Sequence, residues 1–197
     1  MGKRKHLDRI EELFEKSPVV DINSIKRIIR YQSKHTAYAK LVISQLLKKN
    51  KIQKLAKGCY TKHHDNSLVV LCYKPAYLGL QSALSYHGLW EQETIPIILT
   101  SQKVRRGIRS ISGGNVLFRN IQQQYCFGFE YYQDGTFYLP YSDIEKTFID
   151  MIVYRQPLSE DVKKTLRKKI DQKKLERYVS NYPIMIRKKV LNFLQKK

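Results

Sequence analysis

The strongest constraint on the fold is a helical spacing of apolar residues that runs directly into a hairpin pattern near the amino terminus. The hairpin pattern is the segment NKIQKLAKGCYT, which predicts two short strands over residues 51–55 and 59–62. Gly58 supplies the positive φ that the turn between these strands requires. Ahead of the hairpin, apolar side chains recur at intervals of three and four, which predicts one continuous buried helix face over residues 36–50: Ala39, Val42, Ile43, Leu46 and Leu47.

Two shorter helices are expected ahead of this segment. An apolar stripe predicts the first helix over residues 6–14. A second helix, capped by Asn23 or Ser24, is expected to run to about Arg30. Three helices followed by a hairpin is the plan of a winged helix-turn-helix, and we expect such a domain over residues 1–65.

In that plan the third helix lies in the major groove of DNA, and the hairpin, or wing, contacts the backbone or the minor groove. A solvated face is an equally good interpretation of any single lysine. The set is better supported, because residues 26–62 hold many cations and neither Asp nor Glu. The candidate contacts on the reading helix and its approach are Ser33, Lys34, His35, Thr36, Tyr38 and Lys40, and those on the wing are Lys54 and Lys57.

The charge of the chain indicates a polyanionic partner. The 197 residues include 37 Lys and Arg against 17 Asp and Glu, a formal net charge of +20, which is more than solubility requires. The net charge is +10 over residues 1–65, +2 over residues 66–140 and +8 over residues 141–197. Two separate basic surfaces are therefore expected, with a generally lysine-rich surface, as in thermophilic proteins, as the alternative.

Residues 66–197 predict a small α+β domain whose carboxy-terminal part, from about residue 141, is a helical bundle. Buried strands are expected at residues 68–75 and 94–102, with a helix at residues 76–86 between them. The fold class of the whole chain is then α+β. Further strands are expected at residues 115–118, 125–132 and 136–139, and helices at residues 143–153, 159–170, 171–178 and 183–194.

Two helix ends in this domain carry specific signals. In the segment SDIE, Ser142 and Glu145 fit a capping box. After the helix at residues 76–86, Gly88 fits the left-handed residue that follows a helix, and His87 can bond to free carbonyl groups. A general base in a cleft is the alternative role for His87, and we favour the helix end.

No residue set in the sequence predicts catalysis, a cofactor or a metal site. The Walker, GxSxG and HExxH patterns are absent, and the adjacent His63 and His64 would point to opposite faces of a strand. Cys59, Cys72 and Cys126 are expected to be reduced, buried thiols in a cytoplasmic protein. No apolar run is long enough to span a membrane. We therefore expect a non-enzymatic, cytoplasmic protein.

Two central segments resemble a known family. The segment YLGLQSALSYHGLWEQETIPIILTS, from Tyr77 to Ser101, is similar to the helix-YHGL-strand signature of AbiEi-type antitoxins, which are predicted transcriptional regulators of phage-defence loci. The segment YSDIEKTFIDMI, from Tyr141 to Ile152, resembles the EKT-(L/F)-(L/I)-D helix of that family. The resemblance implies a type IV toxin–antitoxin module. Its antitoxin represses its own operon through the amino-terminal domain and opposes a nucleotidyltransferase toxin through the carboxy-terminal domain.

The expected partners are double-stranded DNA of its own promoter and a nucleotidyltransferase toxin, with the chain a monomer or weak dimer. One alternative is a stand-alone winged-helix regulator without a toxin. Another is a nucleic-acid-processing enzyme subunit, in which His87 and the loop 105–109 act on a phosphate. A second basic surface for nucleic acid or an acidic partner is expected from Arg105, Arg106, Arg109, Lys163, Lys164, Arg167 and Lys168.

Overall fold

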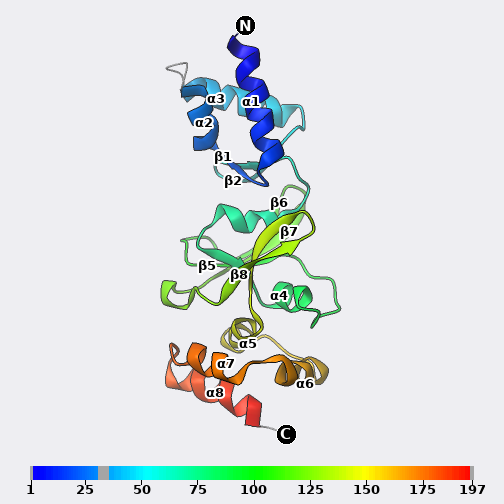
Figure 1. Cartoon of the computed structure of the whole chain (residues 1–197), viewed down its shortest axis with the longest axis vertical. Coiled ribbons are helices and arrows are strands. Elements are labelled where there is room, and N and C mark those ends of the chain that lie inside the picture. Colours follow the sequence, from blue (N-terminus) through cyan, green and yellow to red (C-terminus); the bar gives the residue numbers. More distant parts are fainter. Residues whose placement is uncertain (1, 31–35, 196–197) are drawn as a thin grey trace. The chain divides into compact units, whose positions relative to one another are not determined.

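The computed structural model describes residues 2–30 and 36–195 and divides the chain into two compact units (Figure 1). The first unit consists of residues 1–72 with residues 110–114, and the second of residues 73–109 with residues 115–197. The chain combines helices with two sheets, so the predicted α+β class is confirmed. Within the described residues, no helix is long and apolar enough to cross a membrane.

Among its described residues, the first unit contains three α-helices, a 3-10 helix and a three-stranded antiparallel sheet of order β1-β3-β2. The apolar face predicted for the third helix is buried, because Ala39, Val42, Ile43 and Leu46 are each at most 4% exposed. These side chains pack against Ile10, Phe14, Ile25 and Ile29 of the first two helices. The elements are α1 (Gly2–Lys16), β1 (Val20–Asp21), α2 (Ile22–Arg30), α3 (Thr36–Lys48), β2 (Gln53–Ala56) and β3 (Cys59–Thr61).

Helix α2 is capped by Asp21, not by the residues expected from the sequence. Asp21 Oδ1 accepts the backbone N–H groups of Asn23 at 2.7 Å and of Ser24 at 3.1 Å. Asp21 Oδ2 accepts the Ser24 hydroxyl at 2.7 Å. Burial would raise the pKa of Asp21, but the hydrogen bonds from Ser24 and Asn23 outweigh it and lower that pKa. The cap lies two or three residues earlier than predicted, because the helix already begins at Ile22 and Asn23 and Ser24 belong to its first turn.

The run predicted as a buried strand at residues 68–75 begins instead as a 3-10 helix, η1 (Asn66–Cys72). Leu68, Val69 and Val70 are fully buried, and a short, wholly apolar run does not distinguish a strand from a helical turn. Its last residue, Cys72, forms a disulfide with Cys59 of β3. The expectation of three reduced thiols is therefore wrong for this pair, and Cys126 is the free cysteine.

Reduction of the Cys59–Cys72 disulfide is expected to destabilise the first unit by about 3 kcal/mol, because the bond closes a loop with a sequence separation of 13. Denaturant unfolding with and without a reductant measures this difference. The Cys59→Ser/Cys72→Ser variant should no longer respond to reductant, whereas Cys126→Ser should respond as the natural chain does. Equal unfolding midpoints with and without reductant, in a chain that titrates three thiols, would contradict the prediction.

The second unit is built on a mixed six-stranded sheet of order β6-β7-β5-β4-β9-β8. Strands β5 and β7 are parallel, as are β4 and β9, whereas β4 pairs antiparallel with β5, and β8 with β9. The edge strands are therefore β6 and β8. The strands are β4 (Ala76–Leu78), β5 (Ile97–Thr100), β6 (Gly107–Ile111), β7 (Gly114–Asn120), β8 (Phe129–Asp134) and β9 (Phe137–Ser142).

Helix α5 packs between the sheet and the remaining carboxy-terminal helices (Figure 1). Its side chains Phe148 and Ile149 are fully buried and meet Tyr77 of β4, Leu175 of α7 and Val190 of α8 in one apolar core. The helical bundle predicted from about residue 141 is therefore confirmed. The helices are α4 (Gln81–Tyr86), α5 (Ile144–Val153), α6 (Glu160–Lys169), α7 (Gln172–Val179) and α8 (Ile184–Gln195), with a 3-10 turn η2 (Gln123–Tyr125).

Helix α4 ends as its sequence predicted. His87 is its C-cap, and Gly88 follows with a φ of +66°, the left-handed conformation that glycine adopts most readily. His87 Nε2 lies 2.8 Å from the backbone oxygen of Ser142, so the ring is used to join α4 to the end of β9. The helix begins later than predicted, because residues 76–78 form β4.

A fully buried ion pair lies inside the EKTFID segment of α5. Lys146 Nζ contacts Asp150 Oδ1, and the two side chains are 0% and 1% exposed. The Tyr77 hydroxyl donates to Asp150 Oδ2 at 2.7 Å, and Lys146 Nζ donates to the Tyr182 hydroxyl at 3.0 Å. Burial raises the pKa of Asp150, while Lys146 and the Tyr77 hydroxyl act in the opposite direction. We refer to these four residues as the buried ion-pair cluster.

The capping box expected at the start of α5 is wrong. The N-cap is Asp143, whose carboxylate accepts a first-turn N–H at 2.8 Å, rather than Ser142. Glu145 instead accepts the N–H of Asp171 at 2.9 Å and pairs with Lys174 at 3.2 Å. Glu145 therefore joins α5 to the start of α7, a tertiary role that a local pattern does not reveal.

Candidate nucleic-acid interface

The outer face of α3 is the first part of the candidate interface. The buried positions of α3 repeat at helical spacing, so its exposed positions form a stripe on the opposite side. Leu41, at the middle of that stripe, is 53% exposed. The exposed residues are Ala37, Lys40, Leu41, Ser44, Gln45 and Lys48.

The predicted reading residues fall into four groups. Lys40 is exposed on the outer face of α3, as predicted. Tyr38 is half-buried and packs against the core of the first unit, so only part of its ring is accessible. Thr36 is the first residue of α3. Ser33, Lys34 and His35 lie outside the described residues.

Sequence reasoning did not single out Leu41 and Ser44. Both lie on the exposed stripe of α3 together with Lys40. The signal was present in the spacing, because Lys40, Leu41 and Ser44 occupy positions i, i+1 and i+4 on the side that the buried residues leave free. An exposed leucine beside a lysine suits a surface that meets both apolar and charged atoms.

The hairpin carries the other predicted contacts on a fixed backbone. Lys54 and Lys57 are exposed, with Lys54 on β2 and Lys57 in the turn. Gly58 follows with a φ of +77°, and its carbonyl oxygen accepts the N–H of Ile22 at 2.8 Å. The Ser112 hydroxyl donates to the backbone oxygen of Lys54 at 3.0 Å. The two lysine side chains therefore project from a hairpin whose backbone is held by these two hydrogen bonds.

Two lysines of residues 26–62, the segment without Asp or Glu, form ion pairs with glutamates of helix α1. Lys51 Nζ lies 2.7 Å from Glu11 Oε1, and Lys62 Nζ pairs with Glu15. Among the described residues, no ion pair involves Lys40, Lys54 or Lys57 or the neighbouring Lys48 and Lys49. Within the described ranges, five cations of α3 and the hairpin region are therefore left without a carboxylate partner, as are Arg9 of α1 and Lys26 and Arg27 of α2.

The residues of the second predicted basic surface do not come together. Arg105 and Arg106 are exposed in the loop before the edge strand β6, whereas the lysines of the set lie on α6, which packs against α5. Three members are used within the fold. The Arg109 guanidinium donates to the Arg105 backbone oxygen at 2.8 Å, Arg167 Nε donates to the Phe193 backbone oxygen at 3.2 Å, and Lys163 pairs with Glu160 at 2.6 Å.

Two members of that set remain on the surface of α6. Lys164 lies 3.7 Å from Asp161, and both of these side chains are largely exposed. Lys168 is exposed, and within the described ranges it makes no ion pair. With Arg105 and Arg106, Lys168 is the part of the predicted set that is most open to a partner.

The histidine pair after β3 is engaged with its neighbours. His64 Nδ1 lies 2.7 Å from Gln53 Nε2, and Gln53 Nε2 also donates to the His63 backbone oxygen at 3.0 Å. Burial lowers the pKa of His63, with the neighbouring Lys62 acting in the same direction. In residues 2–30 and 36–195, no group of three or more His, Cys, Asp or Glu residues is arranged to hold a metal ion.

Comparison with known proteins gives a fold relationship. No protein-family model matches the chain, and no curated protein matches it. A similar solved structure is the crystal structure of the RV2827C protein from Mycobacterium tuberculosis, with a TM-score of 0.64 and 14% sequence identity. The match covers 97% of this chain and 76% of that chain. At this identity the likeness concerns the fold alone.

Proposed function

We propose that this chain is a DNA-binding transcriptional repressor whose first unit acts as a winged helix-turn-helix. The observation that carries the proposal is a set of cations without acidic partners on α3 and on the hairpin. Lys40 projects from the exposed face of α3, and Lys54 and Lys57 project from the hairpin, without acidic partners among the described residues. In a chain of net charge +20, this arrangement suits a phosphate backbone better than an uncharged ligand.

In this proposal the outer face of α3 enters the major groove, which is wide enough to admit a helix. Lys40 contacts phosphate or a guanine edge, while Leu41 meets a thymine methyl group. Lys54 and Lys57 contact the backbone beside the groove, as the wing does in this class of domain. Tyr38 is half-buried and packs against the core of the first unit, so only the exposed edge of its ring can contact DNA.

A salt series tests the DNA-binding proposal. If about five cations neutralise phosphates, the logarithm of the affinity should fall with the logarithm of the salt concentration at a slope of about −4 to −5. Footprinting on the DNA upstream of the gene, at two salt concentrations, measures both the site and the slope. A slope near zero, or equal protection of all sequences, would contradict a specific repressor.

The antitoxin role rests on the resemblance of Tyr77–Ser101 and Tyr141–Ile152 to the AbiEi-type signature. We propose that the second unit opposes a nucleotidyltransferase toxin encoded nearby, and that the protein acts in the cytoplasm without enzymatic activity of its own. A stand-alone regulator is the second candidate, because the free cations of the first unit require no toxin. Co-expression of the chain with the product of the adjacent gene separates the two: rescue of growth supports the antitoxin, and an absent or harmless neighbour supports the regulator.

A further inference from the structure

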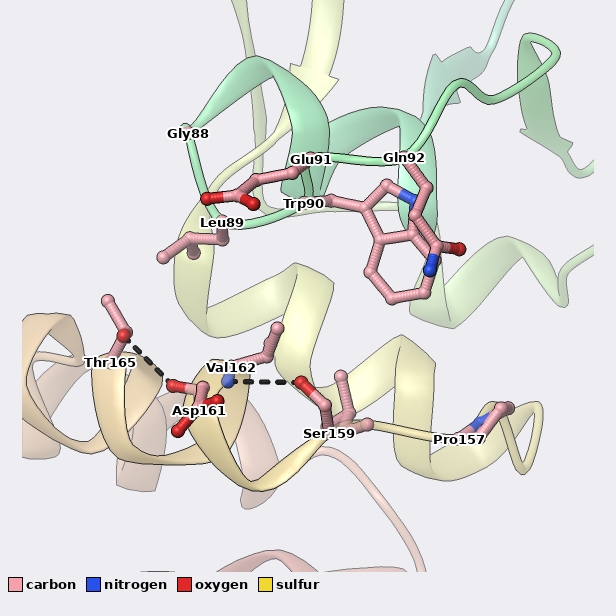
Figure 2. A pocket seen from close by; sticks show the side chains of 11 residues that line it. Gly88, Leu89, Trp90, Glu91, Gln92, Pro157, Ser159, Asp161, Val162 and Thr165 are labelled. Carbon is pink, nitrogen blue, oxygen red and sulfur yellow. Dashed lines mark hydrogen bonds between the residues drawn. The ribbon is translucent and has the colours of Figure 1, made fainter.

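The second unit contains an open groove between the loop after α4 and the start of α6 (Figure 2). Its volume is about 580 Å³, enough to admit two apolar side chains. The loop from Gly88 to Gln92 forms one wall, and the segment from Pro157 to Thr165 forms the other. Both walls belong to the same compact unit.

Part of the groove lining is apolar, and two carboxylates lie at its rim, with Lys169 nearby, whose Nζ donates to the His87 backbone oxygen at 3.3 Å. Leu89, Trp90 and Val162 contribute apolar surface from the core of the unit. Glu91 is exposed at one rim, and Asp161, whose side chain is 94% exposed, lies at the other. Within the described residues, Glu91 makes no ion pair, and Asp161 meets only Lys164 at 3.7 Å. Negative charge around an apolar floor is unusual on a chain of net charge +20.

The first turn of α8 has the opposite character. Ile184 and Met185 are 59% and 70% exposed, more than any other aliphatic side chain of the helical bundle whose exposure the structure describes. Lys188 and Lys189 follow four residues later and are also exposed, so each lysine lies one helical turn beyond one apolar side chain on the same face. We call these four residues the apolar–basic turn.

The apolar–basic turn does not reach the groove of its own chain. The other end of α8 is held beside α5 and α6, since Phe193 packs on Phe148 and its backbone oxygen accepts Arg167 Nε. Ile184 lies nine residues from Phe193, about 14 Å along the helix axis. Buried Tyr182 and Val190 fix the start and the middle of the helix. The turn is therefore directed away from α6 and is available to another molecule.

We propose that the acidic groove of one copy of this chain binds the apolar–basic turn of a second copy. Ile184 and Met185 would occupy the floor beside Trp90, while Lys188 and Lys189 would meet the carboxylates of the rim. The two surfaces differ, so the contact is head-to-tail: in a dimer one copy keeps its groove free and the other keeps its turn free for further neighbours. The contact area is small, which corresponds to a weak association in the micromolar to millimolar range.

Analytical ultracentrifugation of the full chain without DNA tests this inference, over roughly 10 to 500 μM protein, the range in which so small an interface is populated. The natural chain is expected to show an average mass that rises above that of the monomer with concentration. Met185→Glu, which places a carboxylate against the acidic rim, should weaken the association at least about tenfold. Tyr138→Glu is the matched control, because Tyr138 is 62% exposed on β9 and lies on neither surface.

A mixing experiment tests the head-to-tail geometry. Met185→Glu retains the groove, and Glu91→Lys/Asp161→Asn retains the apolar–basic turn. Each variant alone should remain monomeric, and an equimolar mixture should form dimers and no larger species. A natural chain that stays monomeric over the whole range, a Met185→Glu variant that associates normally, or a mixture that stays monomeric would each overturn the proposal. Circular dichroism of both variants, which change exposed side chains only, confirms that they fold.

Discussion

Replacing Lys146 by methionine is expected to lower the free energy of unfolding of the second unit by about 3–5 kcal/mol, the cost of leaving a buried charge without its partner. Asp150 would then keep one hydrogen bond, from the Tyr77 hydroxyl, and lose its ion pair. Methionine fills much of the volume of lysine, so the loss reports the charge rather than a cavity. Urea or guanidinium unfolding, followed by the near-ultraviolet signal of Trp90, measures the difference.

The second arm of that experiment removes both charges. Lys146→Met/Asp150→Leu should recover much of the lost stability, because apolar residues of similar volume can replace a buried ion pair at little cost. Tyr182→Phe is a milder control, since it removes only the hydroxyl that accepts from Lys146 and should cost about 1 kcal/mol. If Lys146→Met alone is as stable as the natural chain, the pair is not buried in the folded protein.

The pH dependence of the Lys146→Met defect follows from the sign of the Asp150 shift. Burial raises the pKa of Asp150 in the folded chain, and removal of Lys146 raises it further by deleting an opposing charge. When the pKa of a carboxyl is raised in the folded chain, ionisation of that carboxyl lowers the free energy of unfolding. This loss is absent below the unfolded pKa of about 3.9 and grows as the pH rises through the folded pKa. The difference between variant and natural chain should therefore shrink as the pH falls from 7 towards about 4.

The spacing of apolar residues predicted those elements that pack through one apolar face. The buried side of α3 needed only the spacing of Ala39, Val42, Ile43 and Leu46, and the structure buries those residues. Gly88 predicted the end of α4, because a left-handed residue after a helix is strongly biased towards glycine. In both places, the residues that decide the structure are neighbours in the sequence.

The same local signals fail where a distant segment decides. Residues 76–78 were predicted to belong to a helix, yet they form β4 because β5 and β9 supply partners on both sides. Glu145 fitted a capping box, yet it bonds to Asp171, 26 residues away. The three cysteines were expected to be free thiols, whereas folding brings Cys59 to Cys72. Tertiary contacts overrode each of these patterns.

The buried ion-pair cluster was the least predictable feature. Lys146 and Asp150 are spaced four residues apart, which is also the spacing of ordinary exposed pairs such as Glu12 and Lys16. Aromatic residues from other parts of the second unit, Tyr77, Phe127 and Tyr182, distinguish the two cases by covering the charges. The candidate interface was more accessible to prediction, because exposed charge on one helix face is a local property.

Charge reversal at Lys40 and Lys54 is expected to weaken binding to the promoter about 100-fold at about 0.1 M salt. A slope of about 0.9 per neutralised phosphate makes each contact worth close to tenfold at that concentration. The two residues come from different elements, α3 and β2, so their losses should be nearly additive. The Lys40→Glu/Lys54→Glu variant should also reduce the steepness of the salt dependence by about 2.

The matched control changes the net charge equally at positions off the interface. Lys16 is exposed on α1 and Lys173 is exposed on α7, so Lys16→Glu/Lys173→Glu has the same charge as the test variant. Fluorescence anisotropy with promoter DNA should then show a loss of less than about threefold. An equal loss in both variants would mean that the charge acts through the field of the whole chain, and α3 with its hairpin would not be the reading surface.

The Leu41→Ala variant distinguishes sequence-specific base contacts from non-specific electrostatic binding on the same surface. Removing an exposed apolar side chain leaves the charge unchanged, so binding to unrelated DNA should be unaffected. If Leu41 contacts a thymine methyl group, affinity for the promoter should fall by about 1 kcal/mol, roughly fivefold, and substitution of that thymine should produce no further loss. A reading helix thus predicts a defect in specificity at Leu41 and a defect in salt dependence at Lys40, whereas a merely basic surface predicts only the second.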